Sequence, residues 1–198
     1  MPVAPKILAF AGSTRTESFN KKLVRLAAAG AQAAGADVTL IDLRDYPMPL
    51  YDGDCEAKEG LPANAQKLKA LMVAHQGLLI SAPEYNSSIS GVLKNTFDWA
   101  SRSIPGEAPL VAFKGKTAAL LSASPGALGG LRGLVHVRAL LNNIGVLVIP
   151  DQLSVPKAHE AFNADGSLKD PKQQAAVENL VRSLTALLQK LHPSERSP

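Results

Sequence analysis

Short apolar segments alternate along this chain with longer segments in which apolar residues recur at helical spacing. Continuous apolar runs of about four to eight residues are typical of strands that are buried on both faces of a sheet. Longer segments with a period of about 3.6 residues indicate amphipathic helices. The predicted strands are 6–11, 37–42, 77–82, 116–123 and 146–149, and the predicted helices are 20–34, 61–75, 92–101, 131–144 and 171–191.

The regular alternation of strand and helix predicts the fold class. Parallel strands need long crossover connections, usually helices, and a sheet covered on both faces has strands of this apolar character. Five β/α units predict a single α/β domain, a flavodoxin-like doubly wound five-stranded parallel sheet with the strand order 2-1-3-4-5. We expect residues 1–191 to form this domain and residues 192–198 to be a disordered tail.

Two segments, residues 43–60 and the helix 92–101, carry features beyond the alternation of strand and helix. Residues 43–60 are long for an α/β connection and locally acidic, which predicts an irregular loop that is either a solvated surface or a subunit contact. On the helix 92–101, the spacing of Asp98 and Arg102 predicts a surface ion pair of small energetic weight. Trp99 is expected to anchor the core or an interface rather than to line a cofactor.

Composition narrows the possible functions. Of the 198 residues, 46% are hydrophobic and 19% are charged, which is typical of a folded domain with a real core. The net charge of +4 comes without a dense basic cluster, so we expect no nucleic-acid partner. No apolar run approaches the roughly 20 residues of a membrane span, so we expect no membrane association.

Cysteine and histidine usage argues against disulfides and metal sites. Cys55 is the only cysteine, which excludes an intramolecular disulfide and suits a reducing compartment. The four histidines lack the spacing of metal ligands, so no metal site is expected. The predicted location is the cytoplasm.

The first polar loop, residues 12–20, follows the first strand and leads into a helix. Its hydroxyl groups, its backbone N–H groups and the helix N-terminus match the oxygens and charge of a phosphate monoester, to which Arg15 adds a charge-assisted contact. The loop has neither the P-loop pattern nor the G-x-G-x-x-G pattern, which favours a mononucleotide phosphate bound without a metal. The alternative is ordinary helix capping by Thr16 or Ser18.

The second polar loop, residues 83–91, follows the third strand, which neighbours the first strand in the predicted order. Ligands of doubly wound sheets bind in the crevice between two such loops. A flat heteroaromatic ring there needs a wall, which Tyr85 or Ile89 can supply, and backbone groups along its polar edge. The alternative is an ordinary turn, with Glu84 as a structural or capping carboxylate rather than a catalytic base.

The segments G-S-T-R-T-E-S-F-N (12–20), P-E-Y-N (83–86), L-K-N (93–95) and D-W (98–99) resemble the NADPH-dependent FMN reductase family, which includes chromate/quinone reductases and some azoreductases. The resemblance implies FMN as the cofactor and NADPH or NADH as the electron donor. It implies phosphate contacts from Ser13, Arg15, Ser18, Phe19 and Asn20, and ring contacts from Pro83, Glu84, Tyr85, Asn86, Ser87, Ser88 and Ile89, with Ser124 and Gly126 after the fourth strand.

In one position the chain departs from the resemblance. Family members often have a proline where this chain has Ser90, and the change predicts a looser second loop. The third loop, residues 124–130, is rich in glycine and is either a ring neighbour or only a tight turn before a helix.

The predicted function is an NAD(P)H-dependent FMN-containing reductase that works by a ping-pong mechanism. Its partners would be small-molecule electron acceptors: quinones, chromate, azo compounds or free flavin. The hard chemistry belongs to the cofactor, so no residue is assigned a catalytic role. Two alternatives are a flavodoxin-type electron carrier, against which the pI near 9.2 counts, and a phosphate-binding regulatory module without flavin. The resemblance also implies a homodimer or homotetramer, with Trp99 and residues 43–60 and 131–141 as candidate contacts.

Overall fold

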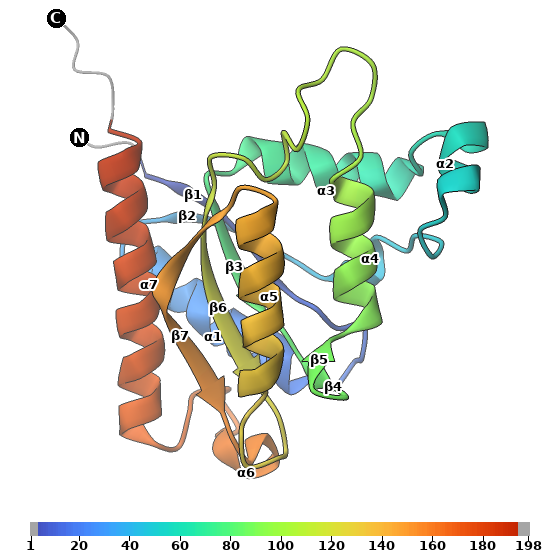
Figure 1. The fold of residues 1–198 in the computed structure, drawn as a ribbon. Helices are drawn as coiled ribbons and strands as arrows, with labels where there is room; N and C mark the ends of the chain where they lie inside the picture. Colours follow the sequence, from blue (N-terminus) through green and yellow to red (C-terminus); the bar gives the residue numbers. More distant parts are fainter. Residues whose placement is uncertain (1–3, 194–198) are drawn as a thin grey trace, which may run out of the picture.

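The computed structural model of this protein describes residues 4–193. Five parallel strands form one sheet in the order β2-β1-β3-β6-β7, which confirms the predicted doubly wound topology (Figure 1). The strands of this sheet are β1 (Lys6–Ala11), β2 (Asp37–Ile41), β3 (Gly77–Ser81), β6 (Thr117–Ala123) and β7 (Leu147–Val155). The predicted tail falls largely on residues 194–198, which lie outside the described part.

Helices cover both faces of the sheet, as Figure 1 shows. On one face α1 (Phe19–Ala33) and α7 (Pro171–Leu191) pack over alternate strand residues such as Ile7 and Leu79. On the other face the covering helices are α3 (Ala63–Ala74), α4 (Gly91–Ala100) and α5 (Leu131–Asn143). Because β1, β3 and β6 are central and buried on both faces, their carboxyl ends are held rigidly at one edge of the sheet.

The sequence had predicted an irregular loop for residues 43–60, and this prediction is wrong. It contains a 3-10 turn, η1 (Leu43–Asp45), and a short helix, α2 (Gly53–Glu59), each capped at its N-terminus by an aspartate side chain. Trp99 Nε1 donates to the Pro49 carbonyl at 2.9 Å and holds the segment against α4. Trp99 is only 1% exposed, so its predicted role as a core anchor is confirmed. The segment is polar and α2 buries no side chain, so no apolar period in the sequence marks that helix.

β7 continues to Val155, past the predicted end of this strand at Ile149. Pro150 lacks an N–H, but β7 is an edge strand, and its register with β6 shifts at this point. The guanidinium of Arg138 on α5 donates to the carbonyls of Ile149 at 2.8 Å and Pro150 at 3.2 Å. These bonds satisfy the backbone where the ladder is interrupted, so the strand resumes with Gln152.

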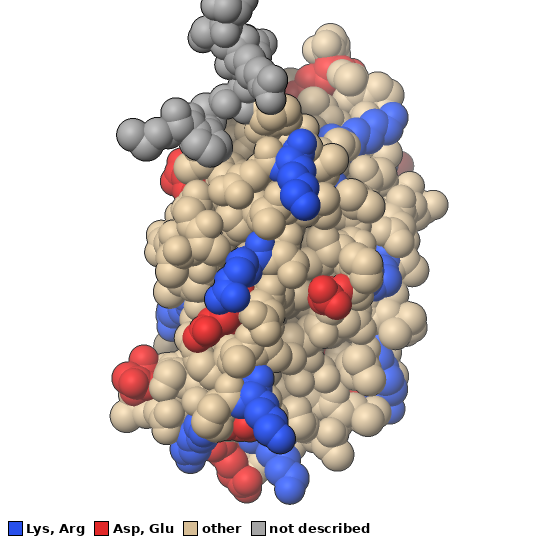
Figure 2. All heavy atoms as spheres, turned by 90° about the vertical axis from the view of Figure 1, so that its left-hand side faces the viewer, with Lys and Arg blue, Asp and Glu red and all other residues tan. Residues whose placement is uncertain are grey.

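Charged side chains are dispersed on the face that Figure 2 shows, which is the side of the molecule that carries α7. Lys and Arg lie singly or in small groups among Asp, Glu and uncharged residues, without a continuous basic stripe on this face. Within residues 4–193, no helix has both the length and the apolar character required to cross a bilayer.

Candidate functional site

Three loops meet at the carboxyl edge of β1, β3 and β6 and enclose a cleft of about 90 Å³. They are the first loop (12–20), the second loop (83–91) and the third loop (124–130). The sheet order brings them together, because β1 neighbours β3 and β3 neighbours β6. The cleft is lined by Ser13, Arg15, Ser18, Phe19, Asn20, Pro83, Glu84, Tyr85, Ala123, Ser124 and Pro125.

The first loop presents unpaired donors to this cleft. Ser18 is the N-cap of α1, yet its hydroxyl caps no backbone N–H, and the first helical bond runs from Lys22 N–H to the Ser18 carbonyl. Within the described chain, the N–H groups of residues 19–21 and the guanidinium of Arg15 have no hydrogen-bond acceptor. Free N–H groups at the start of a 15-residue helix, beside an unpaired cation, are suited to bind an anion. A direct phosphate contact from each predicted residue stays a prediction.

Asn20 has a further role that its place in the motif did not indicate. Its side chain is buried, its Nδ2 donates to the Ala123 carbonyl at 2.9 Å, and its Oδ1 accepts from Ser81 Oγ at 2.8 Å and from Ala123 N–H at 3.0 Å. One amide therefore joins the start of α1 to the ends of β3 and β6. Asn20 fixes the spacing of the loops.

The second loop forms a hairpin of two short strands, β4 (Glu84–Tyr85) and β5 (Ser88–Ile89). Asn86 and Ser87 connect them with φ angles of 49° and 63°, both in the left-handed region. Positive φ at both central residues defines a type I′ hairpin turn, which suits Asn but is strained for Ser. The hairpin leaves the Tyr85 side chain 49% exposed, beside the cleft that it helps to line.

Glu84 ties this hairpin to the N-terminus of α5. Its Oε1 accepts from Arg132 Nε at 2.9 Å, and its Oε2 accepts from Gly133 N–H at 3.1 Å. Burial by itself would raise the pKa of Glu84, but the Gly133 N–H and the Arg132 guanidinium outweigh it and hold the pKa below its ordinary value. The charged carboxylate complements the helix N-terminus, which supports the structural reading of Glu84.

Glu84→Gln should lower the free energy of unfolding by about 1 kcal/mol at neutral pH, because the neutral amide loses the charge attraction. A depressed folded-state pKa stabilises the fold above the unfolded-state pKa, and this contribution is lost as the pH falls through the folded-state pKa. The difference between the two proteins should therefore shrink, in urea titrations, as the pH falls below the ordinary glutamate pKa of about 4.3. Glu59→Gln, at the exposed end of α2, is the matched control. A difference that does not change with pH would contradict this role.

Ser90 bonds the second loop to the first, a contact that the prediction of a looser loop did not include. Its hydroxyl is buried, donates to the Gly12 carbonyl at 2.6 Å and accepts from Leu93 N–H at 3.3 Å. It thereby caps α4 and bonds the second loop to the first. The side-chain hydroxyl makes a cross-loop bond that a proline could not make.

The third loop is supported by a segment that sequence reasoning missed. Gly126 and Ser124 accept backbone bonds from Lys157 N–H at 3.3 Å and Ala158 N–H at 3.0 Å, next to the short helix α6 (Ala158–Ala161). Just beyond α6, the Phe162 ring lies parallel to the Phe19 ring of the first loop, with centroids 6.4 Å apart. No local pattern marks this segment, because its partners are more than 30 residues away in the chain.

The predicted Asp98–Arg102 ion pair is wrong. Asp98 pairs with Lys94, one turn earlier on α4, at 2.5 Å. The Arg102 side chain instead donates to the Asp98 backbone carbonyl at 3.2 Å and lies over the Tyr51 ring, 5.3 Å from its centroid. Arg102 follows the C-terminus of α4, so its side chain reaches the free carbonyls there in preference to the carboxylate.

The sequence and the fold are similar to those of known flavoenzymes. The family described as NADPH-dependent FMN reductase matches residues 5–160. An NAD(P)H-dependent FMN reductase of Pseudomonas aeruginosa is 35% identical over 187 residues, 94% of this chain and 96% of the relative. A quinone reductase of Escherichia coli is 32% identical over 183 residues, 91% of this chain and 92% of the relative.

Solved structures of flavin proteins share this fold. The flavoenzyme NAD(P)H:acceptor oxidoreductase FerB from Paracoccus denitrificans matches with a TM-score of 0.78 at 26% identity, covering 96% of this chain and 100% of that one. A flavodoxin from an archaeon matches with a TM-score of 0.62 at 11% identity over 93% of this chain and 99% of that one, which shows the shared fold. The chain belongs to the NADPH-dependent FMN reductase family: it is an oxidoreductase that uses FMN and NAD(P)H.

Proposed function

We propose that this protein binds FMN across the three loops and reduces small soluble acceptors, quinones first among them, by a ping-pong mechanism. One observation carries the placement of the cofactor: the Arg15 guanidinium and the first N–H groups of α1, which have no acceptor among residues 4–193, face the same cleft as the hairpin of the second loop. A phosphate satisfies these donors, and a flat ring is compatible with the half-exposed Tyr85 on the other side.

The residues present fit FMN. Ser13, Ser18 and Arg15 supply hydroxyl and cationic donors for the phosphate at the start of α1. The volume of about 90 Å³ suits a phosphate rather than a whole cofactor, so the ring would extend to the open side of the cleft. Backbone N–H groups near Asn86 would donate to the polar edge of the ring. FMN, when bound, supplies the hydride chemistry, and no protein acid or base is required.

The open side of the cleft supports the ping-pong proposal. With the phosphate enclosed and the ring at the surface, nicotinamide and acceptor would use the same exposed ring face in turn. Such a surface selects acceptors weakly by shape, which extends the proposed acceptors from quinones to chromate, azo compounds and free flavin. Quinones are placed first because several relatives are named quinone reductases, including those of Escherichia coli and rice.

Steady-state kinetics test this function directly. With NADPH or NADH varied at several fixed benzoquinone concentrations, parallel double-reciprocal lines are expected. Intersecting lines would contradict the shared ring face. Protein that holds FMN fully but oxidises no nicotinamide in the presence of a quinone or ferricyanide would contradict the proposed reductase.

Arg15→Ala should weaken FMN binding by about tenfold to a hundredfold, because a charge-assisted contact to the phosphate is lost. Binding of riboflavin, which lacks the phosphate, should change little. Quenching of flavin fluorescence on titration into flavin-free protein measures both affinities. Equal FMN affinity in the variant and the parent would refute the assignment of Arg15 to the phosphate.

The proposed assembly is a homodimer or homotetramer acting in the cytoplasm. Leu131 and Val135 lie one turn apart on α5 and are 41% and 58% exposed, which is unusual for large apolar side chains at helical spacing. They give the predicted contact region 131–141 an apolar surface. A reducing compartment that maintains NAD(P)H is consistent with the single cysteine, Cys55.

A further inference from the structure

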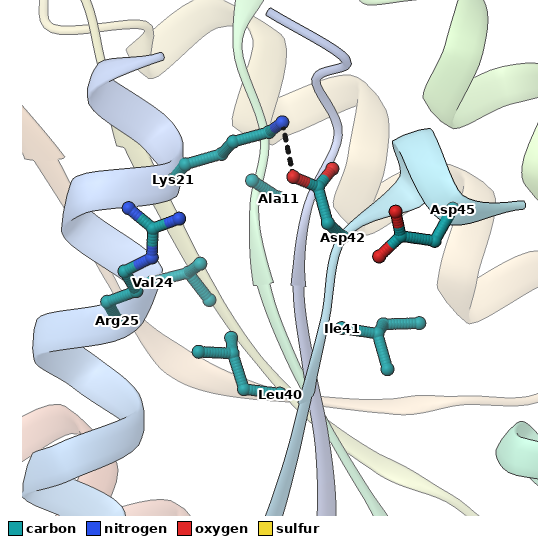
Figure 3. A pocket seen from close by; sticks show the side chains of 8 residues that line it. All are labelled: Ala11, Lys21, Val24, Arg25, Leu40, Ile41, Asp42 and Asp45. Atoms are coloured by element: carbon teal, nitrogen blue, oxygen red, sulfur yellow. Dashed lines mark hydrogen bonds and ion pairs between the residues drawn. The ribbon is translucent and has the colours of Figure 1, made fainter. Parts of the chain in front are cut away.

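A second cavity, of about 230 Å³, lies beside the first loop, between α1 and the edge strand β2. Figure 3 shows Lys21, Val24 and Arg25 of α1 on one side of it, and Leu40, Ile41, Asp42 and Asp45 on the other. The Lys21 and Asp42 side chains point toward each other across its upper end, where the dashed line marks their ion pair. None of the sequence motifs includes the β2 side of this cavity.

The ion pair fixes the turn that follows β2. Lys21 Nζ lies 2.6 Å from Asp42 Oδ2, and the Lys21 side chain is only 7% exposed. The other carboxylate oxygen, Oδ1, accepts from Arg44 N–H at 3.0 Å and caps η1. Burial acts to raise the pKa of Asp42, but the Lys21 ammonium and the Arg44 N–H outweigh it and hold the pKa below its ordinary value. Asp42 therefore stays charged and sets the position of Arg44.

The Arg44 side chain reaches back from this turn to the middle of the first loop. Its Nε and Nη2 donate to the Thr14 carbonyl at 3.1 and 2.6 Å, and Nη2 also donates to Thr16 Oγ1 at 2.9 Å. Residues 14–16 are exposed, and in the described chain they make no other hydrogen bond to a different element. Arg44 is thus the tether for the stretch of loop that carries Arg15.

We propose that Arg44 is a positioning residue for the FMN phosphate. An exposed loop without a tether samples many conformations, and binding must then supply the free energy of ordering it. The guanidinium holds residues 14–16 in one arrangement before the phosphate arrives, with Lys21 and Asp42 fixing the guanidinium in turn. This inference rests on the proposed phosphate site and assigns a function to a residue outside the family's motif.

The geometry at this position suits arginine better than lysine. A planar guanidinium donates in two directions at once, here to a carbonyl and to a hydroxyl, whereas an ammonium is a compact charge without this fork. Arg44→Lys should therefore retain the charge but hold the loop less firmly. Arg25→Ala is the matched control, because Arg25 is exposed, lines the same cavity and makes no hydrogen bond or ion pair within residues 4–193.

The test compares the affinities of the full chain for FMN and for riboflavin in flavin-fluorescence titrations. Arg44→Ala should weaken FMN binding by about tenfold and riboflavin binding by less than about twofold. Arg44→Lys should give an intermediate loss for FMN, and Arg25→Ala should leave both affinities as in the parent. Thermal unfolding shows whether each variant is folded. If Arg44→Ala is not folded, the comparison is made with Arg44→Lys instead.

Three results would overturn the inference: unchanged FMN affinity in Arg44→Ala, equal losses for FMN and riboflavin, or an equal loss in Arg25→Ala. The last result would show that net charge alone matters. A parent protein that binds FMN no better than riboflavin contradicts the proposed phosphate site itself. That outcome can be told apart from failure of the Arg44 inference, because it is seen in the parent protein alone.

Discussion

Replacing Asn20 with alanine is expected to lower the free energy of unfolding by about 3 to 5 kcal/mol and to abolish stable FMN binding. The buried amide makes three hydrogen bonds, and its removal leaves Ser81 Oγ and both backbone groups of Ala123 without these partners. Each buried polar group left unsatisfied costs about 1 to 3 kcal/mol. The ends of β3 and β6 would separate from α1, and the loops would lose their common spacing.

Urea unfolding and FMN titration measure the two effects of Asn20→Ala. The control is Asn142→Ala, because Asn142 is exposed on α5 and its side chain makes no hydrogen bond to the described residues. A loss of less than about 1 kcal/mol would show that water or neighbouring groups replace the amide. Unchanged FMN affinity would show that the loop spacing does not depend on Asn20.

The substitution Gly130→Ala should destabilise the fold by about 3 kcal/mol or more, because two separate obstacles meet at this residue. Its φ of +91° is unfavourable for any residue with a Cβ, and a Cβ built there would lie 1.9 Å from Ser122 Oγ. That hydroxyl is buried and donates to the Ala82 carbonyl at 2.7 Å, so it cannot move without losing its bond. The start of α5, on which the Glu84 hairpin rests, would be displaced.

Chemical unfolding of Gly130→Ala, with and without Ser122→Ala, separates the two obstacles. The double variant removes the clash with the hydroxyl but retains the backbone strain, so it should recover part of the lost stability. Gly91→Ala is the control, because nothing lies within 4 Å of a Cβ built at Gly91, the first residue of α4. Full stability in Gly130→Ala would mean that the loop relaxes freely, contrary to its close packing.

Features that depend on neighbouring residues were predictable from the sequence. The buried strands are continuous apolar runs because both faces of the sheet are covered, and this property alone located β1, β3 and β6. The strand order then placed the first and second loops at neighbouring strand ends. The structure places residues 13 and 85, far apart in the chain, on the lining of one cleft.

Roles that depend on a distant partner were not predictable from the sequence. Arg44 and Arg132 are surface arginines without a motif, yet one holds the first loop and the other binds the Glu84 carboxylate. Ser90 was read as a loosening change because its bond to Gly12, 78 residues earlier, is invisible in the linear order. The 3-10 turn η1 is only three residues long and α2 buries no side chain, so neither has an apolar period that the sequence could show.

The sequence by itself determined the fold class, the strand order and which connections lie at the carboxyl edge of the central strands, because burial and helical period are set by neighbouring residues. Only the tertiary structure decided how those connections are held. Hydrogen bonds and ion pairs between loops depend on distances of a few ångströms between side chains from different elements. Those distances depend on how the sheet packs the elements together, so residue spacing along the chain does not predict them.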